Sequence, residues 1–552
     1  MKDGAPGLGY AADRLWRMVW PKVTVTKPAQ GIRFESDVAV PMRDGVRLRI
    51  NVFRPAREGR FPVLISAHPY GKDALPQRAP WAPTAISRYR GMRTPERVTF
   101  SAYTGWEAPD PSFWVPRGYA VLSADLRGFG TSEGMGSYFS DQEARDYAEL
   151  IEWAAAQPWS TGMVGLNGVS YLAISQWKVA ALRPKSLAAI CPWEGFTNFY
   201  QDVAYPGGVR EDGFVPFWTR LTEVAGRCSY VMREQQLRRP DWDEFWASLI
   251  PDLERIQVPA LLCASFSDHG QHTRGSFEAF RCIGSTHRFL YTHRGGKWST
   301  YYSQDALAVQ ARFFDHYLKG EDSGIGAQPR VRIEVRSRGE VIHEVRSESV
   351  WPPPDTQWEP WFLAPGELRT VPLDSSTSTS FDLTVGRASF TFLVRDDLEL
   401  TGPMKLKLWV ELSGASDANL FVGVRKFEGN AVVGFEGTSG FGRDTVTKGW
   451  LRLAHRRLDS ERSVPHHPVH PCDRAEPLAQ GQICPVEIEL LPSATFFRPG
   501  DALRLDVQGR FFWPRNPFFG MFPGAYAPSG PGTLTVHMGG EHDSHLLVPR
   551  RK

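Results

Sequence analysis

The sequence predicts a mixed α/β domain followed by an all-β domain, and three patterns lead to that prediction. Apolar runs at 62–67 and 119–124 lack polar alternation, which is typical of strands covered on both faces. Apolar residues at helical spacing separate such runs, most clearly over 141–157, which Ser140 and Glu143 open as a capping box. From about residue 356, short alternating stretches with Gly and Pro turns replace the helical pattern.

The chain of 552 residues is too long for one core, because single cores stop growing near ~250–300 residues. Aromatic and charged helical segments interrupt the strand rhythm after about residue 195, which indicates a cap inserted into the α/β domain. The stretch WPPPD at 351–355 is a stiff linker. We therefore expect an α/β domain at 1–195 and 258–350, a helical cap at 196–257, and a jelly-roll-like β-sandwich at 356–552.

Composition favours a small-molecule partner over a nucleic acid or a membrane. The net charge is only +3, with 64 Lys and Arg against 61 Asp and Glu, and no long basic run occurs. No window reaches the ~18 uncharged apolar residues of a membrane span, and the N-terminus lacks the apolar core of a secretory signal. The six cysteines are scattered, so we expect them to be reduced, in the cytoplasm. A homo-oligomer is left open.

The stretch VGLNGVSYLA at 164–173 contains a candidate nucleophile, Ser170. In the α/β-hydrolase elbow, G-x-S-x-G, a strand turns sharply into a helix and holds a serine oxygen clear of the sheet. Gly168 occupies the first glycine position, but Leu172 occupies the second, and the small residue Ala173 comes one position late. By pattern alone, a nucleophile and an ordinary buried serine are about equally compatible with this stretch.

Several motifs together resemble the cocaine esterase and X-prolyl dipeptidyl-peptidase (CocE/NonD) family, which includes the α-amino acid ester hydrolases. The nucleophile stretch GVSYLA, followed by Gln176 and Trp177, is similar to that family's G-x-S-Y-x-G motif, with Ala173 as the departure. Further landmarks are DGVRL at 44–48, PYGK at 69–72, DLRGFGTS at 125–132 and FFDHYLKG at 313–320. The resemblance covers nearly the whole chain, and it implies an α/β-hydrolase domain with a cap and a β-rich C-terminal part.

A serine nucleophile needs a base oriented by a carboxylate, in the chain order Ser, Asp or Glu, His. Asp268 follows the predicted strand at 258–264 and matches the family's acid, with a plain turn aspartate as the alternative. We predict His293 as the base because it ends the next strand on the loop side, although the family's usual Gly-Pro-Trp is missing and a surface histidine is the alternative. His269 and His272 are weaker rivals because they lie close to the acid in sequence.

The oxyanion of acyl transfer needs hydrogen-bond donors that are already in place. The backbone N–H of Tyr171, the residue after the nucleophile, is one candidate. The family resemblance implies that the phenol of Tyr70 is the second, with a core tyrosine as the alternative.

The predicted function is that of a serine hydrolase that cleaves an ester or activated amide through an acyl-enzyme. An X-Pro dipeptidyl-peptidase or an α-amino acid ester hydrolase is the first alternative, and would need carboxylates for a substrate ammonium, with Glu194, Asp202 and Glu211 as candidates. A carbohydrate-binding protein with an inactive hydrolase fold is the alternative from another class. We expect no cofactor and no metal, and no catalytic group in 356–552.

Overall fold

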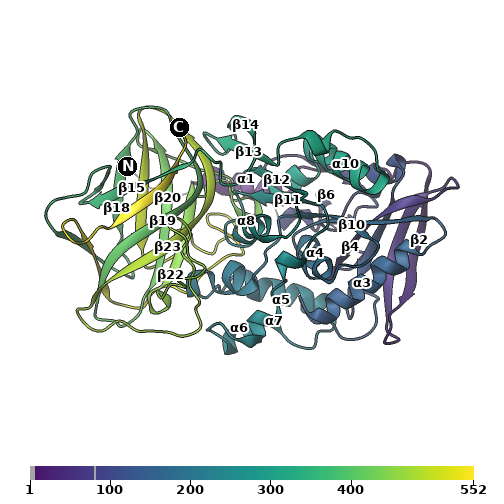
Figure 1. Ribbon diagram of the computed structural model, residues 1–552, viewed down its shortest axis with the longest axis horizontal. Coiled ribbons are helices and arrows are strands. Elements are labelled where there is room, and N and C mark those ends of the chain that lie inside the picture. Colours follow the sequence, from purple (N-terminus) through teal and green to yellow (C-terminus); the bar gives the residue numbers. More distant parts are fainter. Residues whose placement is uncertain (1–6, 80–81, 92) are drawn as a thin grey trace.

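The computed structural model describes residues 7–552 apart from 80–81 and 92. An α/β part and a β-rich part lie beside each other, with the β-rich part, green to yellow, at one end of the molecule (Figure 1). A mixed sheet runs through the α/β part in the order β2–β3–β8–β4–β9–β10–β11–β12–β13–β14. Its strands are β2 (Ile32–Pro41), β3 (Arg47–Pro55), β8 (Ala120–Asp125), β4 (Phe61–His68), β9 (Ser160–Val169), β10 (Leu187–Trp193), β11 (Ala260–Ser265), β12 (Arg288–His293), β13 (Val331–Arg336) and β14 (Ile342–Glu348).

The strands from β8 to β13 are parallel to one another. At the two edges, β3 pairs with β2 and β8, and β13 pairs with β14, in antiparallel fashion. After β4 the chain crosses over to β8 on one side of β4. It then crosses back to β9 on the other side of β4. The predicted mixed α/β fold is therefore confirmed.

Both faces of the parallel strands are buried, which explains why their sequences do not alternate. On β4, Val63 and Ile65 belong to one apolar cluster and Leu64 belongs to another. The first cluster includes residues of α3, α4 and α8, and the second includes Phe314 of α10. These helices are α3 (Asp141–Ala155), α4 (Tyr171–Leu182), α8 (Thr273–Cys282) and α10 (Gln304–Lys319).

Helix α3 begins where the capping signal predicts. The Ser140 side chain accepts a hydrogen bond from the Glu143 N–H at 3.1 Å. In a capping box the N3 side chain accepts from the N-cap N–H. Here Glu143 Oε2 accepts instead from the N–H of the preceding residue, Phe139, at 3.2 Å. One N–H of the first helical turn and the N–H of the residue before the cap are thus satisfied.

Short helices fill the segment between β10 and β11 and lie over one end of the sheet. Its elements are the π-helix η3 (Tyr200–Ala204), α5 (Phe214–Ala225), α6 (Met232–Arg238) and α7 (Glu244–Ser248). Trp218 of α5 and Trp246 of α7 are buried in the same apolar cluster as α3 and α4. Aromatic burial therefore holds this segment against the domain that carries the predicted site. Within the described chain, no helix is long and apolar enough to cross a bilayer.

The C-terminal part is built from strands packed around an apolar cluster of its own. The long strand β19 pairs with β23, β25 and β26, while β24 pairs with β18 and β20. The bounds are β15 (Gln357–Ala364), β16 (Glu367–Arg369), β17 (Thr377–Asp382), β18 (Ala388–Leu393), β19 (Leu398–Ser413), β20 (Asn419–Glu428), β21 (Ala431–Val433), β22 (Thr447–Arg452), β23 (Ile483–Phe497), β24 (Asp501–Gln508), β25 (Thr533–Met538) and β26 (His545–Arg550). A β-rich domain after the α/β domain is confirmed.

A largely covered arginine joins three parts of the chain at the junction of the two domains. Arg274 of α8 contacts Asp202 of η3 and Glu489 of β23, each at 3.1 Å. Asp202 is fully buried, and Arg274 holds the pKa of Glu489 at about 2 against the opposing effect of burial. The guanidinium therefore ties the α/β domain, the helical segment and the β domain together.

We expect Arg274→Met to lower the free energy of unfolding by about 3 kcal/mol, because it leaves the buried Asp202 and the partly buried Glu489 without their shared cation. Urea denaturation followed by tryptophan fluorescence measures the change. Arg238→Met, which removes an exposed pair with Glu234, is the matched control and should shift stability by less than about 1 kcal/mol. Equal midpoints for the two variants would contradict the assignment.

Candidate active site

Ser170 lies at a strained turn between β9 and α4. Its φ of 59° and ψ of −117° lie outside the regions that non-glycine residues ordinarily adopt. Its N–H donates to the carbonyls of Trp193 at 3.0 Å and Glu194 at 3.2 Å, at the end of the neighbouring strand β10. The surrounding backbone therefore fixes the strain, as expected of a functional turn.

The structure explains why this turn accepts Leu172 in place of the second glycine. Gly168 has a φ of 155°, and a Cβ added there would lie 2.4 Å from the Cβ of Leu172. Gly195 plays the same part opposite Ala173, because its added Cβ would lie 3.0 Å from the Ala173 Cβ. The space that one glycine would leave at 172 is thus provided by glycines at 168 and 195.

The side chain of Ser170 faces a histidine of the loop between β11 and α8. Ser170 Oγ lies 3.2 Å from His272 Nε2, and His272 Nδ1 lies 2.5 Å from Asp268 Oδ2. With the Nδ1–H donated to the carboxylate, the Nε2 lone pair faces the serine hydroxyl. The structure therefore brings the predicted nucleophile and the predicted acid together through His272.

Closeness in sequence to Asp268 makes His272 the weaker candidate in the sequence, but the local backbone reverses that argument. The N–H groups of Gln271, His272 and Thr273 all donate to the Asp268 carbonyl. The loop therefore makes a helical turn as it enters α8, and residues four apart in such a turn lie side by side. The i, i+4 spacing was the signal for this pair.

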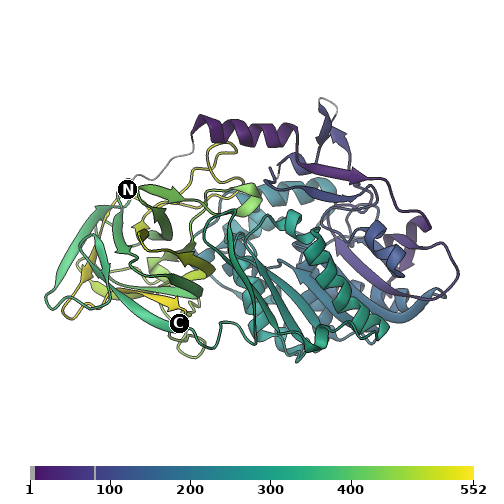
Figure 2. The ribbon, with the colours of Figure 1, turned by 90° about the horizontal axis from the view of Figure 1, so that it is seen from above.

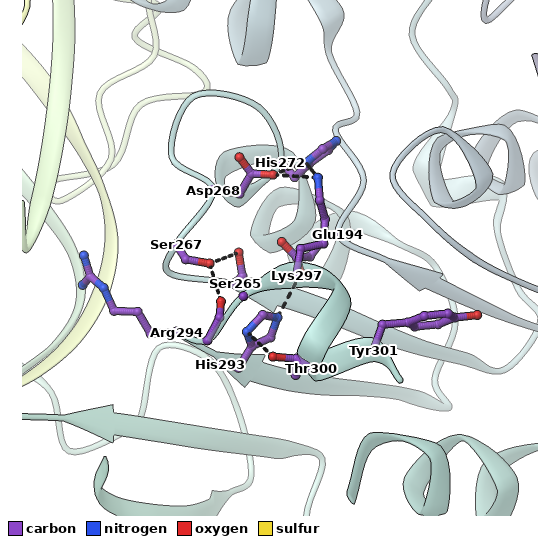
Figure 3. Close-up of polar contacts among 12 residues, drawn as sticks. Glu194, Ser265, Ser267, Asp268, His272, His293, Arg294, Lys297, Thr300 and Tyr301 are labelled. Atoms are coloured by element: carbon purple, nitrogen blue, oxygen red, sulfur yellow. Dashed lines mark hydrogen bonds and ion pairs between the residues drawn. The ribbon is translucent and has the colours of Figure 1, made fainter. Parts of the chain in front are cut away.

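The predicted base, His293, has other partners in the structure. Its Nε2 lies 3.0 Å from Glu194 Oε1, and its Nδ1 lies 3.3 Å from Thr300 Oγ1. Both ring nitrogens are thereby engaged, and the ring is 1% exposed. Figure 3 shows the Asp268–His272 pair and the His293–Thr300 contact at different places, with Glu194 and Lys297 between them. The histidine that contacts Ser170 in the structure is therefore His272, and not His293.

Charge around Asp268 keeps its carboxylate ionised although it is buried. Lys297 Nζ lies 3.2 Å from Asp268 Oδ2, and the Thr438 hydroxyl donates to Oδ1 at 2.7 Å. Burial opposes ionisation, but Lys297 and His272 outweigh it and hold the pKa of Asp268 well below its usual range. Burial also disfavours the charged lysine, yet Asp268, Glu107 and Glu194 raise the pKa of Lys297. The site therefore holds an ionised acid at neutral pH.

Glu107 is a further buried acid of this region that the sequence did not reveal. Its backbone has a φ of 62°, its carbonyl accepts from the Val169 N–H, and its carboxylate accepts from Trp298 Nε1 at 3.0 Å. Burial raises the pKa of Glu107 to about 7, with Lys297 acting in the opposite direction. The nucleophile turn is thus anchored by the carbonyls of two residues with positive φ, Glu107 and Glu194.

The two predicted oxyanion donors lie near the turn. Tyr171 begins α4, so its N–H has no partner within the helix. The Tyr70 hydroxyl accepts a hydrogen bond from Trp218 Nε1 at 3.3 Å, and its own proton remains available to a ligand. Burial raises the pKa of Tyr70 above its usual value, so the phenol stays a donor at neutral pH.

Aromatic rings form an apolar wall beside the nucleophile. Phe196 stacks on the His272 ring with centroids 6.3 Å apart, and Phe139 lies 5.1 Å from Phe196 and 4.9 Å from Tyr171. Trp218 of α5 stacks on Tyr171 at 6.2 Å. The wall therefore combines the hydrolase sheet with the helical segment between β10 and β11.

One group in the described part of the chain has ligand atoms spaced as a metal would require. Atoms of Glu194, Cys263 and His293 lie within 4.8 Å of one another at the ends of β10, β11 and β12. Burial raises the pKa of the Cys263 thiol well above its usual value, and a metal would have to displace that proton. Glu194 Oε1 contacts His293 Nε2, whereas Glu194 Oε2 is buried without a hydrogen-bond partner among the described residues.

The fold and the strained serine turn define a hydrolase of the α/β class with a C-terminal β domain. The family model of X-Pro dipeptidyl-peptidases (S15 family) matches residues 44–230, and the model of their C-terminal non-catalytic domain matches residues 323–547. A solved CocE/NonD family hydrolase from Staphylococcus aureus is 37% identical with a TM-score of 0.89, over 96% of this chain and 99% of the other. The chain belongs to the CocE/NonD family of serine hydrolases.

Two more distant relatives agree with this assignment. The cocaine esterase of Rhodococcus sp. (strain MB1 Bresler) is 27% identical over 93% of this chain and 98% of its own length. A solved α-amino acid ester hydrolase, 17% identical with a TM-score of 0.70 over 96% of this chain and 98% of its own, shares the fold. Membership of a hydrolase family sets aside the alternative of a carbohydrate-binding protein with an inactive fold.

We expect substitution of His272 and substitution of His293 to have different effects. His272→Ala should lower kcat for an ester by roughly 10³-fold or more, because it removes the base facing Ser170. His293→Ala should retain most of the turnover of each correctly folded molecule and instead lower the thermal midpoint, because it leaves Glu194 buried without a partner. Steady-state kinetics and thermal unfolding on both variants measure this, and the reverse pattern would return the role of the base to His293.

Proposed function

We propose that Ser170, His272 and Asp268 form the catalytic triad of an esterase that acts on small-molecule esters or activated amides. The observation that carries the proposal is the continuous chain of contacts from Ser170 Oγ through His272 to the ionised Asp268. A serine hydroxyl is a weak nucleophile, and this arrangement supplies the adjacent base and its orienting carboxylate.

In the first half of the reaction, Ser170 Oγ attacks the carbonyl carbon while its proton passes to His272 Nε2. The tetrahedral intermediate collapses, the bond to the leaving group breaks, and His272 returns the proton to the departing oxygen or nitrogen. In the second half, a water molecule gives a proton to His272 and attacks the acyl carbon. The bond to Ser170 Oγ then breaks, His272 returns that proton to Oγ, and the acid is released. Asp268 stays ionised throughout and stabilises the imidazolium.

The oxyanion is held by two donors of different kinds in this proposal. The Tyr171 N–H lies at the start of α4, where the helix dipole favours negative charge. The Tyr70 phenol, already fixed through its oxygen by Trp218, donates its remaining proton. Both groups are in place before substrate binds, which is what transition-state stabilisation requires.

An apolar acyl group suits the wall beside Ser170. The uncharged rings of Phe139, Phe196 and Trp218 pack against one another beside the nucleophile turn. Burying an aromatic or aliphatic acyl group against such rings is favourable in proportion to the apolar area removed from water. The name of the cocaine esterase relative, an ester hydrolase, agrees with this choice.

The alternatives that bind an amino terminus need a carboxylate that is free to receive an ammonium group. The three candidates are all buried and contact other groups, although Glu194 Oε2 has no hydrogen-bond partner in the part of the chain that the structure describes. Glu194 contacts His293, and Asp202 contacts Arg274. Glu211 accepts from the N–H groups that open α5. These partners favour an ester hydrolase over an X-Pro dipeptidyl-peptidase or an α-amino acid ester hydrolase. A panel of esters and X-Pro amides compared by kcat/KM distinguishes the classes.

We place the enzyme in a reducing compartment such as the cytoplasm. The support is that Cys191, Cys228, Cys263, Cys282, Cys472 and Cys484 are all free thiols. Buried thiols are stable in a compartment that keeps cysteines reduced.

Ser170→Ala should abolish labelling by a fluorophosphonate probe and nearly all turnover of a p-nitrophenyl ester. The substitution removes the only atom that forms the acyl bond and leaves the fold intact, so the thermal midpoint should stay close to that of the wild type. Ser175→Ala, a nearby serine of α4 whose hydroxyl bonds the Ala67 carbonyl, is the control that should still be labelled. Labelling of the Ser170 variant at the wild-type rate would remove the proposal.

Tyr70→Phe keeps the ring and deletes one oxyanion donor. We expect kcat to fall by roughly 10²–10³-fold while KM changes little, because the lost bond forms in the transition state. Stopped-flow acylation and thermal unfolding on the same variant measure both effects. Near-normal acylation with a lowered midpoint would make Tyr70 a partner of Trp218 only.

A further inference from the structure

The β domain contributes one of the groups that contact Asp268. Thr438 begins the short 3₁₀ turn η7 (Thr438–Gly440), in the loop between β21 and β22. Its hydroxyl donates to Asp268 Oδ1 at 2.7 Å, while Oδ2 receives His272 and Lys297. The two oxygens of the buried carboxylate are therefore held from two domains.

The loop that carries Thr438 is itself anchored by the N-terminal helix. Arg14 of α1 (Leu8–Val19) is 1% exposed and donates to the carbonyl of Gly440 at 2.9 Å and to that of Pro517 at 3.1 Å. Its guanidinium also lies over the Phe441 ring at 5.6 Å. In Figure 2, α1 lies over the junction of the α/β and β domains. A continuous set of contacts thus leads from α1 to Asp268.

A carboxylate held through one oxygen can turn about its Cβ–Cγ bond, and this one must present Oδ2 to His272 Nδ1. The Thr438 hydroxyl on Oδ1 removes that freedom with a hydrogen bond to an ionised acceptor, which is among the stronger kinds. The adjoining cavity, lined by Ser267, Lys297 and Thr438, measures about 10 Å³. That volume is at the lower limit for one water molecule, so solvent is a poor replacement for the hydroxyl.

We propose that Thr438 is a positioning residue that fixes Asp268 against His272, and that Arg14 of the N-terminal helix holds the loop that presents it. The inference rests on the proposed triad of Ser170, His272 and Asp268. It gives the domain that was expected to carry no catalytic group a direct part in orienting the base.

Thr438→Val, which keeps the shape and deletes the donor, should lower kcat for a p-nitrophenyl ester by about tenfold with little change in KM. Thr438→Ser restores the hydroxyl and should return kcat to within about twofold of the wild type, which a merely structural methyl group would not do. Ser439→Ala deletes the hydroxyl of the next residue in the same turn and should leave kcat unchanged. Unfolding midpoints of all variants show whether the fold is retained.

A double-mutant cycle tests the part assigned to Arg14. Arg14→Gln should lower kcat because the loop is no longer held, and it should add little further loss in the Thr438→Val background. Residues that act through a shared partner give non-additive effects, whereas independent sites add. Additive losses would show that Arg14 does not act through Thr438.

The failure of this inference differs from the failure of the triad. Suppose that the wild type is labelled by a fluorophosphonate at Ser170 and that Thr438→Val turns over substrate at the wild-type rate. That result contradicts only the positioning role of Thr438. The same holds if Thr438→Ser is as slow as Thr438→Val in folded protein. If the wild type is not labelled at Ser170, the triad fails, and the Thr438 proposal falls with it.

Discussion

The site depends on keeping one buried carboxylate ionised and fixed. Asp268 lies at the end of a strand that is covered on both faces, where an unpaired charge would cost several kcal/mol. His272, Lys297 and Thr438 compensate that cost from a helix start, a neighbouring helix and the β domain. Because the compensation comes from separate parts of the chain, the acid is in place only when those parts are assembled.

The strained turn at Ser170 depends on a second assembly of the same kind. The carbonyls that receive the N–H groups of Ser170 and Val169 belong to Trp193, Glu194 and Glu107, which lie outside the turn itself. Glu194 is held in turn by His293. His293, predicted from the sequence as the base, thus supports a residue whose carbonyl anchors the nucleophile turn, while the proposed base comes from the loop that supplies the proposed acid. Two acid–histidine pairs therefore lie at the same end of the sheet.

The fold and several site residues could be predicted from the sequence because they depend on local pattern. Uninterrupted apolar runs marked β4, β8 and β11, the Ser140 cap marked the start of α3, and turns placed Ser170 and Asp268 after strands. The histidine that contacts Ser170 was harder to predict from the sequence. His293 had the right position relative to its strand, and the distance in sequence counted against His272. Only the helical turn after Asp268, with its N–H groups bonded to one carbonyl, shows that four residues bring the two side chains together.

By itself the sequence determined the order of strands and helices, the strand–serine–helix turn and the α/β-hydrolase class, since apolar periodicity and turn residues act over a few positions. The tertiary structure decided which histidine meets Ser170, that Glu194 pairs with His293, and that Thr438 reaches Asp268 from 170 residues away. Those contacts follow from strand order and domain packing, which bring together residues that no local spacing relates. The sequence determines the chemistry of each residue, whereas the fold determines which residues it contacts.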